Sequence, residues 1–312
     1  MTTAVLSALI RPLVEPRLPE WVEARWFASE EEALDFAPQA EIGWFDFTQP
    51  EPMVQVVTAA TNLKWLNSIY AGLDFLPLDL LRERGVTVTN GAGINAITIA
   101  EYTVMLMLTH AKGFAEVVRA QDRREWLLDS PGKRELAGER VLLLGLGAIG
   151  QLVKTRLEAF GMEVVPVRRS GEGGALKPDE WRARLGECDW VILAVPATPE
   201  TEHMIGAEEL TAMKPTAVLV NIARGSVVDQ TALVEALREK RIEAALLDVT
   251  TPEPLPPDHP LWEMENATIT MHLSGRAQTK MFQRSADRFI ENLHHWQAGE
   301  PVEPQMDLTL GY

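Results

Sequence analysis

Short apolar segments alternate with amphipathic segments along the second half of the chain, from about residue 140 onward. The apolar segments have the length of buried strands, whereas Gln151–Phe160 and Thr231–Lys240 carry apolar residues at helical spacing. This alternation is typical of βαβ units around a parallel sheet. It predicts a doubly wound α/β domain. The expected strands are Val141–Leu144, Glu163–Val167, Trp190–Val195, Ala217–Ile222, Glu243–Leu247 and Ala267–Met271.

The first hundred residues show the same alternation of apolar and amphipathic segments less regularly. They predict a second, smaller α/β domain. An apolar-rich helix at Ile97–His110 is expected to connect the two domains, and a last helix at Lys280–Gln297 precedes an irregular tail. The expected strands of the smaller domain are Val5–Ile10, Ile42–Trp44, Leu63–Ile69 and Val86–Val88.

The net charge of the chain indicates which classes of binding partner are not expected. The 312 residues carry 29 Lys and Arg against 45 Asp and Glu, a formal net charge of -16. Such a field repels nucleic acid and anionic lipid, so we expect neither as a partner. No apolar stretch reaches the roughly 18 residues of a membrane-spanning helix, and the first ten residues lack the basic start of a signal peptide.

A single cysteine, Cys188, excludes an intramolecular disulfide. This suits a reducing compartment, and we expect a cytoplasmic protein. Cys188 precedes an apolar run and is interpreted as a packing residue, because nothing in its sequence context marks an activated thiol; a catalytic thiol is the alternative.

A glycine-rich turn follows the first strand of the larger domain. Gly145, Gly147 and Gly150 form Gly-x-Gly-x-x-Gly, with Ala148 and Ile149 opening the next helix. The first glycine permits a tight turn, the second lets backbone N–H groups approach a pyrophosphate, and the third allows close packing of helix on strand. The motif predicts a dinucleotide-binding Rossmann domain; a glycine-rich turn without a ligand is the alternative.

The second strand ends in Arg168, Arg169 and Ser170, where NAD-selective sites place a carboxylate against the ribose. Two guanidinium groups and a hydroxyl suit a 2'-phosphate instead. The segment therefore predicts NADP(H) in preference to NAD(H). NAD(H) remains a possible cofactor. Solvated loop charges are the alternative.

The other strands deliver further candidate residues to the same edge: Pro196, Ala223 with Arg224, Asp248, and His272. Together with Glu253, the arginine and histidine are the parts of a carbonyl-handling site. Arg224 would pair with a substrate carboxylate and polarise the carbonyl, His272 would donate a proton, and Glu253 would orient the imidazole. Ordinary loop charges that never converge are the alternative. No catalytic metal is expected, because no His-Glu-x-x-His motif occurs.

Four segments together closely resemble the D-isomer-specific 2-hydroxyacid dehydrogenase family: Gly145–Gly150, Asn221–Asp229, Leu247–Leu255 and Thr270–Gly275. The resemblance implies that Arg224, Glu253 and His272 form the catalytic set and that Asp248 orients the nicotinamide amide. Leu63–Asp74 is similar to the loop that binds the substrate carboxylate in the family, with backbone N–H groups at Ala71 and Gly72. The passage into the connecting helix, Asn90–Glu101, matches as well.

The resemblance also implies an architecture. The smaller, flavodoxin-like substrate domain would span residues 1–105 and be completed by 282–312, with a Rossmann domain at 106–281 between them. Most family members are homodimers, built largely through the nucleotide-binding domain, and a homodimer is expected here. The Arg168–Ser170 segment resembles the NADPH-preferring glyoxylate and hydroxypyruvate reductases most. Two departures, Met271 and Thr250, stand where the family often has proline and a bulky aromatic residue.

These observations predict an NADPH-preferring oxidoreductase that reduces small 2-oxo acids, such as glyoxylate or hydroxypyruvate, to D-2-hydroxy acids. Arg276, four residues after His272, is a candidate second anion contact, with a surface salt bridge as the alternative. Two other functions stay open. One is a nucleotide-sensing binding protein like the dehydrogenase-like corepressors, and the other is an NAD-linked dehydrogenase of another small acid.

Overall fold

The structure is a computed structural model, which describes residues 1–73, 75–276 and 278–309. The chain divides into two compact units. Unit 1 comprises Met1–Asn95 and Arg276–Tyr312, and unit 2 comprises Ala96–Gly275. These boundaries lie before the expected ones at 105/106 and 281/282. The reason at the first crossing is that helix α5 (Ala96–Ala111) packs along its length with α7 (Ala148–Ala159) of unit 2.

Unit 2 is built on a parallel sheet of six strands in the order β11-β10-β9-β8-β6-β7. The chain starts in β6, adds β7 on one side and then crosses to β8 on the other. This reversal creates a switch point at the carboxyl ends of β6 and β8, where doubly wound folds bind ligands. The strands are β6 (Arg140–Leu144), β7 (Glu163–Val167), β8 (Trp190–Leu193), β9 (Val218–Asn221), β10 (Ala244–Leu247) and β11 (Ala267–Ile269).

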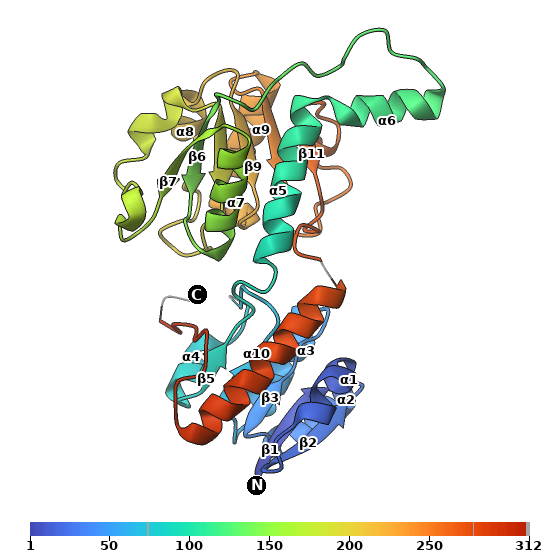
Figure 1. Cartoon of the computed structure of the whole chain (residues 1–312), viewed down its shortest axis with the longest axis vertical. Helices are drawn as coiled ribbons and strands as arrows, with labels where there is room; N and C mark the ends of the chain where they lie inside the picture. Colours follow the sequence, from blue (N-terminus) through green and yellow to red (C-terminus); the bar gives the residue numbers. More distant parts are fainter. Residues whose placement is uncertain (74, 277, 310–312) are drawn as a thin grey trace. The chain divides into compact units, whose positions relative to one another are not determined.

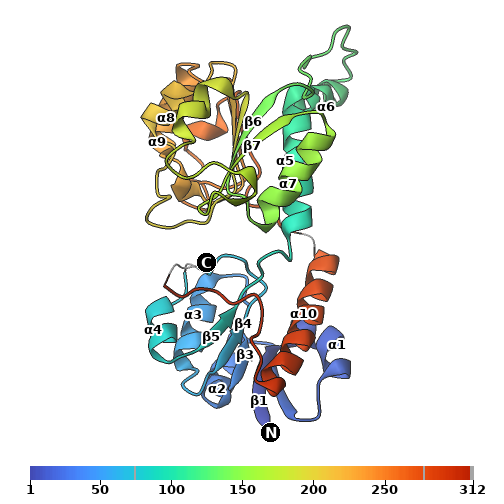
Figure 2. The ribbon, with the colours of Figure 1, turned by 60° about the vertical axis from the view of Figure 1, so that its left-hand side comes forward.

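Helices cover both faces of the unit 2 sheet. Helices α5 and α7 pack on one face, and α8 (Ala207–Ala212) and α9 (Gln230–Arg238) pack on the other (Figure 2). The four central strands β6, β8, β9 and β10 are almost entirely buried, as expected for a parallel sheet covered on both sides. Helix α6 (Phe114–Arg123) and the segment after it extend away from the rest of this unit (Figure 1).

Unit 1 contains a second parallel sheet, in the order β2-β1-β3-β4-β5, which is the flavodoxin order. Its strands are β1 (Thr2–Ser7), β2 (Val22–Phe27), β3 (Ile42–Trp44), β4 (Trp65–Asn67) and β5 (Thr87–Thr89). Helices α1 (Arg11–Val14) and α10 (Gln278–Ala298) pack on one face. The other face is covered by α2 (Glu30–Phe36), α3 (Pro50–Ala59) and α4 (Leu78–Glu83).

The expected fold class, a doubly wound domain with a smaller flavodoxin-like domain, is confirmed. All six strands expected in unit 2 are present, with ends that differ by two residues or fewer. Unit 1 differs from the expectation at one strand that was not predicted and at one whose end was wrong. Strand β2 was missed because its charged Glu23 and Arg25 lie on an edge strand. The strand expected at Val5–Ile10 ends at Ser7, whose hydroxyl accepts a hydrogen bond from Leu9 N and caps a helical turn.

Cys188 lies immediately before β8 in a fully buried position. Burial raises the pKa of its thiol to about 11, so the thiol is protonated at neutral pH and unsuited to nucleophilic chemistry. This environment agrees with a packing role. Among the described residues, no helix is both long and apolar enough to cross a membrane.

Candidate active site

Parallel strands end at a common edge, so the unit 2 sheet brings together the segments that follow its strands. The glycine turn follows β6, and Arg168 follows β7. Arg224, Asp248 and His272 come one to three residues after the ends of β9, β10 and β11. Candidate residues far apart in the sequence therefore share one edge of the sheet.

The glycine turn between β6 and α7 has the backbone that a dinucleotide needs. Gly145 has a φ of 105°, and a Cβ there would lie 2.4 Å from Ala194 O. A Cβ on Gly150 would lie 2.0 Å from Gly145 O, so these two glycines are required by close packing. Among the described residues, a Cβ on Gly147 would meet nothing within 4 Å. The middle glycine thus leaves open space beside the first turn of α7, where Ala148 and Ile149 lie, and the turn fits a pyrophosphate.

The segment after β7 places acidic groups beside the two arginines. Arg168 Nη1 lies 3.9 Å from Glu172 Oε2, and the Ser170 hydroxyl donates to the same carboxylate oxygen at 3.2 Å. The hydrogen bond from Thr198, backbone hydrogen bonding and the charge of Arg169 lower the pKa of Glu200. Both arginines therefore have an acidic neighbour, which the sequence analysis did not anticipate.

Pro196 lies in the exposed segment after β8. Its carbonyl accepts a hydrogen bond of 2.7 Å from the Thr201 hydroxyl, which also accepts from Thr198 N. The segment that carries Pro196 is thus held by the same short turn that lies beside Glu200.

Arg224 lies in a turn after β9 whose backbone is fixed by hydrogen bonds to a side chain. The Asn221 side chain accepts a hydrogen bond from Ala223 N at 3.0 Å and donates one to Arg224 O at 2.9 Å. A Cβ on Gly225 would lie 2.0 Å from Thr250 O, so the loop after β9 touches the loop after β10. No role for Asn221 was predicted from the sequence; an Asn at the end of a buried strand is the signal that could have identified it.

His272 and Glu253 form a hydrogen-bonded pair. His272 Nδ1 lies 2.8 Å from Glu253 Oε2, and Glu253 Oε1 accepts a hydrogen bond of 3.1 Å from Thr250 N. Burial acts to raise the pKa of Glu253, but its hydrogen bond with His272 and the charges of His272 and Arg224 outweigh this and lower the pKa. The structure thus brings all three expected catalytic residues together. The histidine side chain is 46% exposed, which leaves it accessible to a substrate.

Asp248 fastens the loop that carries His272. Its buried carboxylate accepts hydrogen bonds from the Thr270 hydroxyl at 2.7 Å, from Leu273 N at 3.0 Å, and from both the backbone and the hydroxyl of Ser274. Met271 and His272 have φ values of 54° and 56°, in the left-handed region that most residues avoid. Asp248 therefore stabilises a strained turn, a role that the sequence analysis did not predict. The expected contact of Asp248 with a nicotinamide stays a prediction.

The expected carboxylate-binding residues Ala71 and Gly72 belong to unit 1, in the loop after β4. The Asn90 side chain donates to Ala71 O at 2.8 Å, and Gly91 N donates to Tyr70 O at 2.7 Å. Within the described part of the chain, no hydrogen bond uses the N–H groups of Ala71 and Gly72. Asp74, the last residue of the matching segment, lies outside the described residues.

The two departures and Arg276 have different surroundings. Thr250 is buried and Met271 is 61% exposed. Arg276 is an exposed residue of unit 1, and its charge acts on the Tyr70 phenol.

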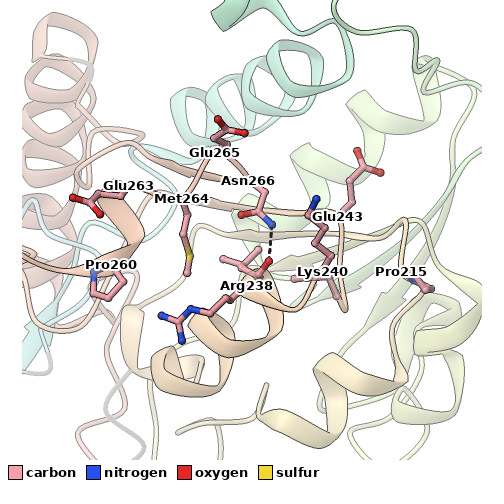
Figure 3. Close-up of a pocket in the computed structure, with 11 residues that line it drawn as sticks. Pro215, Arg238, Lys240, Glu243, Pro260, Glu263, Met264, Glu265 and Asn266 are labelled. Atoms are coloured by element: carbon pink, nitrogen blue, oxygen red, sulfur yellow. Dashed lines mark hydrogen bonds between the residues drawn. The ribbon is translucent and has the colours of Figure 1, made fainter.

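A depression of about 740 Å³ lies elsewhere on unit 2, at the amino ends of its strands. Glu243 and Asn266 directly precede β10 and β11, and Arg238 ends α9 (Figure 3). The depression contains none of the expected site residues. Among residues 1–73, 75–276 and 278–309, no three His, Cys, Asp or Glu side chains are grouped to hold a metal ion.

Comparisons with known proteins show which family the chain resembles. The family model of the D-isomer specific 2-hydroxyacid dehydrogenase NAD binding domain matches residues 104–274. A glyoxylate reductase from Thermofilum pendens is 35% identical over 251 residues, which cover 77% of this chain and 73% of that protein. A D-3-phosphoglycerate dehydrogenase from Methanocaldococcus jannaschii is 35% identical over 241 residues, which cover 75% of this chain but 45% of the relative. This chain therefore spans about half the length of that protein.

Among solved structures, an NADPH-dependent glyoxylate/hydroxypyruvate reductase from Sinorhizobium meliloti, in complex with NADP and malonate, has a TM-score of 0.81. It is 27% identical in sequence, and the match covers 99% of this chain and 98% of that chain. The likeness therefore extends over both units.

Proposed function

The chain belongs to the D-isomer specific 2-hydroxyacid dehydrogenase family of NAD(P)-dependent oxidoreductases, and we propose that it reduces small 2-oxo acids such as glyoxylate and hydroxypyruvate to D-2-hydroxy acids. The observation that carries the proposal is the His272–Glu253 pair of 2.8 Å with Arg224 acting on the same carboxylate. An acid, the carboxylate that orients it and a cation are the groups that a carbonyl reduction requires.

In this mechanism His272 supplies the proton. Its Nδ1–H donates to Glu253, which fixes the ring and leaves Nε2–H to protonate the carbonyl oxygen as it gains negative charge. A nicotinamide cofactor, when bound, would supply the hydride to the carbonyl carbon. Glu253 stays ionised because its pKa is lowered, so it stabilises the charged form of His272 before the proton leaves.

The substrate carboxylate would be bound by Arg224 and by the N–H groups of Ala71 and Gly72. A guanidinium is suited to this task because it donates two parallel hydrogen bonds to a carboxylate. Asn221 holds the backbone on both sides of Arg224, which limits the directions that the side chain can take. Arg224 also polarises the carbonyl in this proposal.

The glycine turn and Arg168, Arg169 and Ser170 would hold the cofactor, with NADPH preferred. What supports this preference is the guanidinium pair at the end of β7 and the absence of a carboxylate at the strand end itself. The relative from Sinorhizobium meliloti that was solved with NADP supports it as well. The side chain of Glu172 is 73% exposed and bonded only at the surface, so a 2'-phosphate can displace it from Arg168 and Ser170 at little cost.

The test of this proposal is steady-state oxidation of NADPH and NADH with glyoxylate, hydroxypyruvate, pyruvate and a branched 2-oxo acid. We expect turnover with at least one acid and a kcat/KM for NADPH at least about tenfold above that for NADH, or about 1.4 kcal/mol. The double substitution of Arg168 and Arg169 by alanine should remove this preference and leave the NADH reaction within about twofold, because only the 2'-phosphate contacts are lost.

Arg238→Ala is the matched control, because this exposed arginine lies at the opposite edge of the unit 2 sheet (Figure 3). It should change neither reaction. A preference for NADH in the unaltered protein would contradict the cofactor assignment and favour an NAD-linked dehydrogenase. Nucleotide binding without turnover of any acid would contradict the reductase and favour the nucleotide-sensing binding protein.

A homodimer is part of the proposal. Helix α6 and the segment after it expose apolar side chains that a monomer would leave in water, among them Phe114, Trp126 and Leu128. Trp126 is 90% exposed and Leu128 is 97% exposed. Such clusters mark interaction surfaces, and the extension of α6 away from its own unit suits contact with a second copy.

Replacing Trp126 and Leu128 together by alanine should shift the dimer toward monomer, because the variant loses two large apolar side chains from the contact. Analytical ultracentrifugation should show the dimer dissociation constant raised by at least about tenfold. Leu9→Ala, which removes an exposed leucine from unit 1, is the control. A monomeric unaltered protein, or a double variant that stays dimeric, would contradict the assignment.

A cytoplasmic location completes the proposal. It rests on Cys188, which is a free buried thiol and not part of a disulfide. Proteins of oxidising compartments more often use their cysteines in disulfides.

A further inference from the structure

Asp46 lies two residues after β3, with its carboxylate enclosed in unit 1. Its Oδ2 accepts hydrogen bonds from Trp44 Nε1 at 2.6 Å and from Ile69 N at 2.7 Å. Its Oδ1 accepts a hydrogen bond of 2.6 Å from the Ser68 hydroxyl. One carboxylate thus receives three donors, two of which belong to the loop after β4.

That loop is the one that carries Ala71 and Gly72. The Ser68 hydroxyl also accepts from Tyr70 N at 3.1 Å, and the Tyr70 hydroxyl donates to Phe47 O at 2.7 Å. The N–H groups of Ile69 and Tyr70 are therefore satisfied inside unit 1. The next two N–H groups, of Ala71 and Gly72, have no acceptor among the described residues. The hydrogen bonds within unit 1 thus use the N–H groups of Ile69 and Tyr70 and leave those of Ala71 and Gly72 for an anion.

A carboxylate is an expensive group to enclose, so its presence calls for a reason. Burial raises the pKa of Asp46 to about 6, although its three hydrogen bonds oppose the shift. An ionised aspartate accepts hydrogen bonds at both of its oxygen atoms. An asparagine, which has the same size, accepts at its oxygen but donates from its nitrogen. The three donors around Asp46 consequently match an aspartate and only partly match an asparagine.

We propose that Asp46 is a positioning residue for 2-oxo acid binding, which holds Ser68 and Ile69 so that the N–H groups of Ala71 and Gly72 face the substrate carboxylate. It acts through the loop and does not touch the substrate. The inference rests on the proposed function, in which Ala71 and Gly72 bind that carboxylate. It adds a residue from the segment that follows β3, 22 positions before Ser68 in the sequence.

The test compares Asp46→Asn, Asp46→Ala and Ser68→Ala in the full chain at pH 8. Asp46→Ala should raise the KM for the 2-oxo acid by about tenfold or more, with kcat and the KM for NADPH within about twofold. Asp46→Asn retains one acceptor atom and should recover part of this loss. Ser68→Ala should raise the KM less than Asp46→Ala, because the bond from Ile69 N to Asp46 remains.

A second measurement does not depend on turnover. Oxamate, a non-reducible analogue of a 2-oxo acid, is titrated against each variant in the presence of NADPH, with tryptophan fluorescence as the signal. Its dissociation constant should rise in parallel with KM. Asp35→Asn, the same change at an exposed position on α2, is the matched control, and melting temperatures report whether each variant is folded.

Three outcomes would overturn the inference. One is an unchanged KM and oxamate affinity in folded Asp46→Asn and Asp46→Ala. Another is a loss of kcat and of NADPH affinity in the same proportion as KM, which would indicate general damage. The third is no oxamate binding by the unaltered protein. If the unaltered protein reduces no 2-oxo acid but binds oxamate in an Asp46-dependent way, the proposed function fails and the role of Asp46 stands.

Discussion

His272→Ala is expected to lower kcat for 2-oxo acid reduction by about 10²- to 10⁴-fold, the range associated with removal of a general acid. The developing alkoxide would lose its proton donor, since the Glu253 carboxylate is ionised and cannot take over this task. The dissociation constant for NADPH should stay within about twofold, because His272 lies on the β11 loop and not on the glycine turn. Stopped-flow turnover and a fluorescence titration of NADPH would measure the two effects.

His294→Ala is the matched control, since it removes an exposed histidine from α10 and should leave kcat unchanged. Glu253→Gln provides a second comparison. It keeps a hydrogen-bond acceptor near Nδ1 but removes the negative charge, so kcat should fall, though less than in His272→Ala. Retention of most of the turnover in His272→Ala would show that another group donates the proton.

Arg224→Ala is expected to affect binding and turnover together. Loss of a charge-assisted contact with the substrate carboxylate costs about 1.5–3 kcal/mol, which corresponds to a rise in KM of about 10- to 100-fold. The carbonyl also loses the cation that polarises it, so kcat should fall by about tenfold or more in addition. Glu253 would then lose one of the charges that lower its pKa. Initial rates over a range of 2-oxo acid concentrations separate KM from kcat.

Arg224→Lys distinguishes charge from geometry at this position. A lysine keeps the positive charge but cannot donate two parallel hydrogen bonds, so it should recover part of kcat and little of the KM. The two results together discriminate Arg224 from Arg276. If Arg224→Ala leaves KM unchanged while Arg276→Ala raises it, the substrate carboxylate is bound in unit 1 and not by the β9 loop.

Carboxylates near the expected cofactor site change what the two arginines imply about cofactor preference. From sequence, Arg168 and Arg169 are two positive charges at a strand end. In the structure, Glu172 lies near the first and Glu200 is attracted to the second. The cofactor preference therefore depends on how easily these carboxylates move aside, and charge on the strand end alone does not decide it.

Most of the elements, and the location of the chemistry, could be predicted from the sequence. Apolar runs of strand length predicted the six strands of unit 2, because a parallel sheet covered on both faces needs continuous apolar strands. The glycine spacing identified the turn after β6, because close contacts exclude a side chain at Gly145 and at Gly150. Positions directly after strands located Arg224, Asp248 and His272, because parallel strands end at one edge.

Which of these residues meet, and what holds them in place, could not be predicted from the sequence. Glu253 and His272 are 19 residues apart, and their contact of 2.8 Å depends on the pairing of β10 with β11. The contact between Asp248 and Ser274 depends on that pairing as well. The contact between Asp46 and Ser68 depends on the pairing of β3 with β4. Strand order and hydrogen bonds between loops set these contacts. Local sequence patterns record whether a residue is buried and which backbone conformation it favours, but they do not record its distant neighbours.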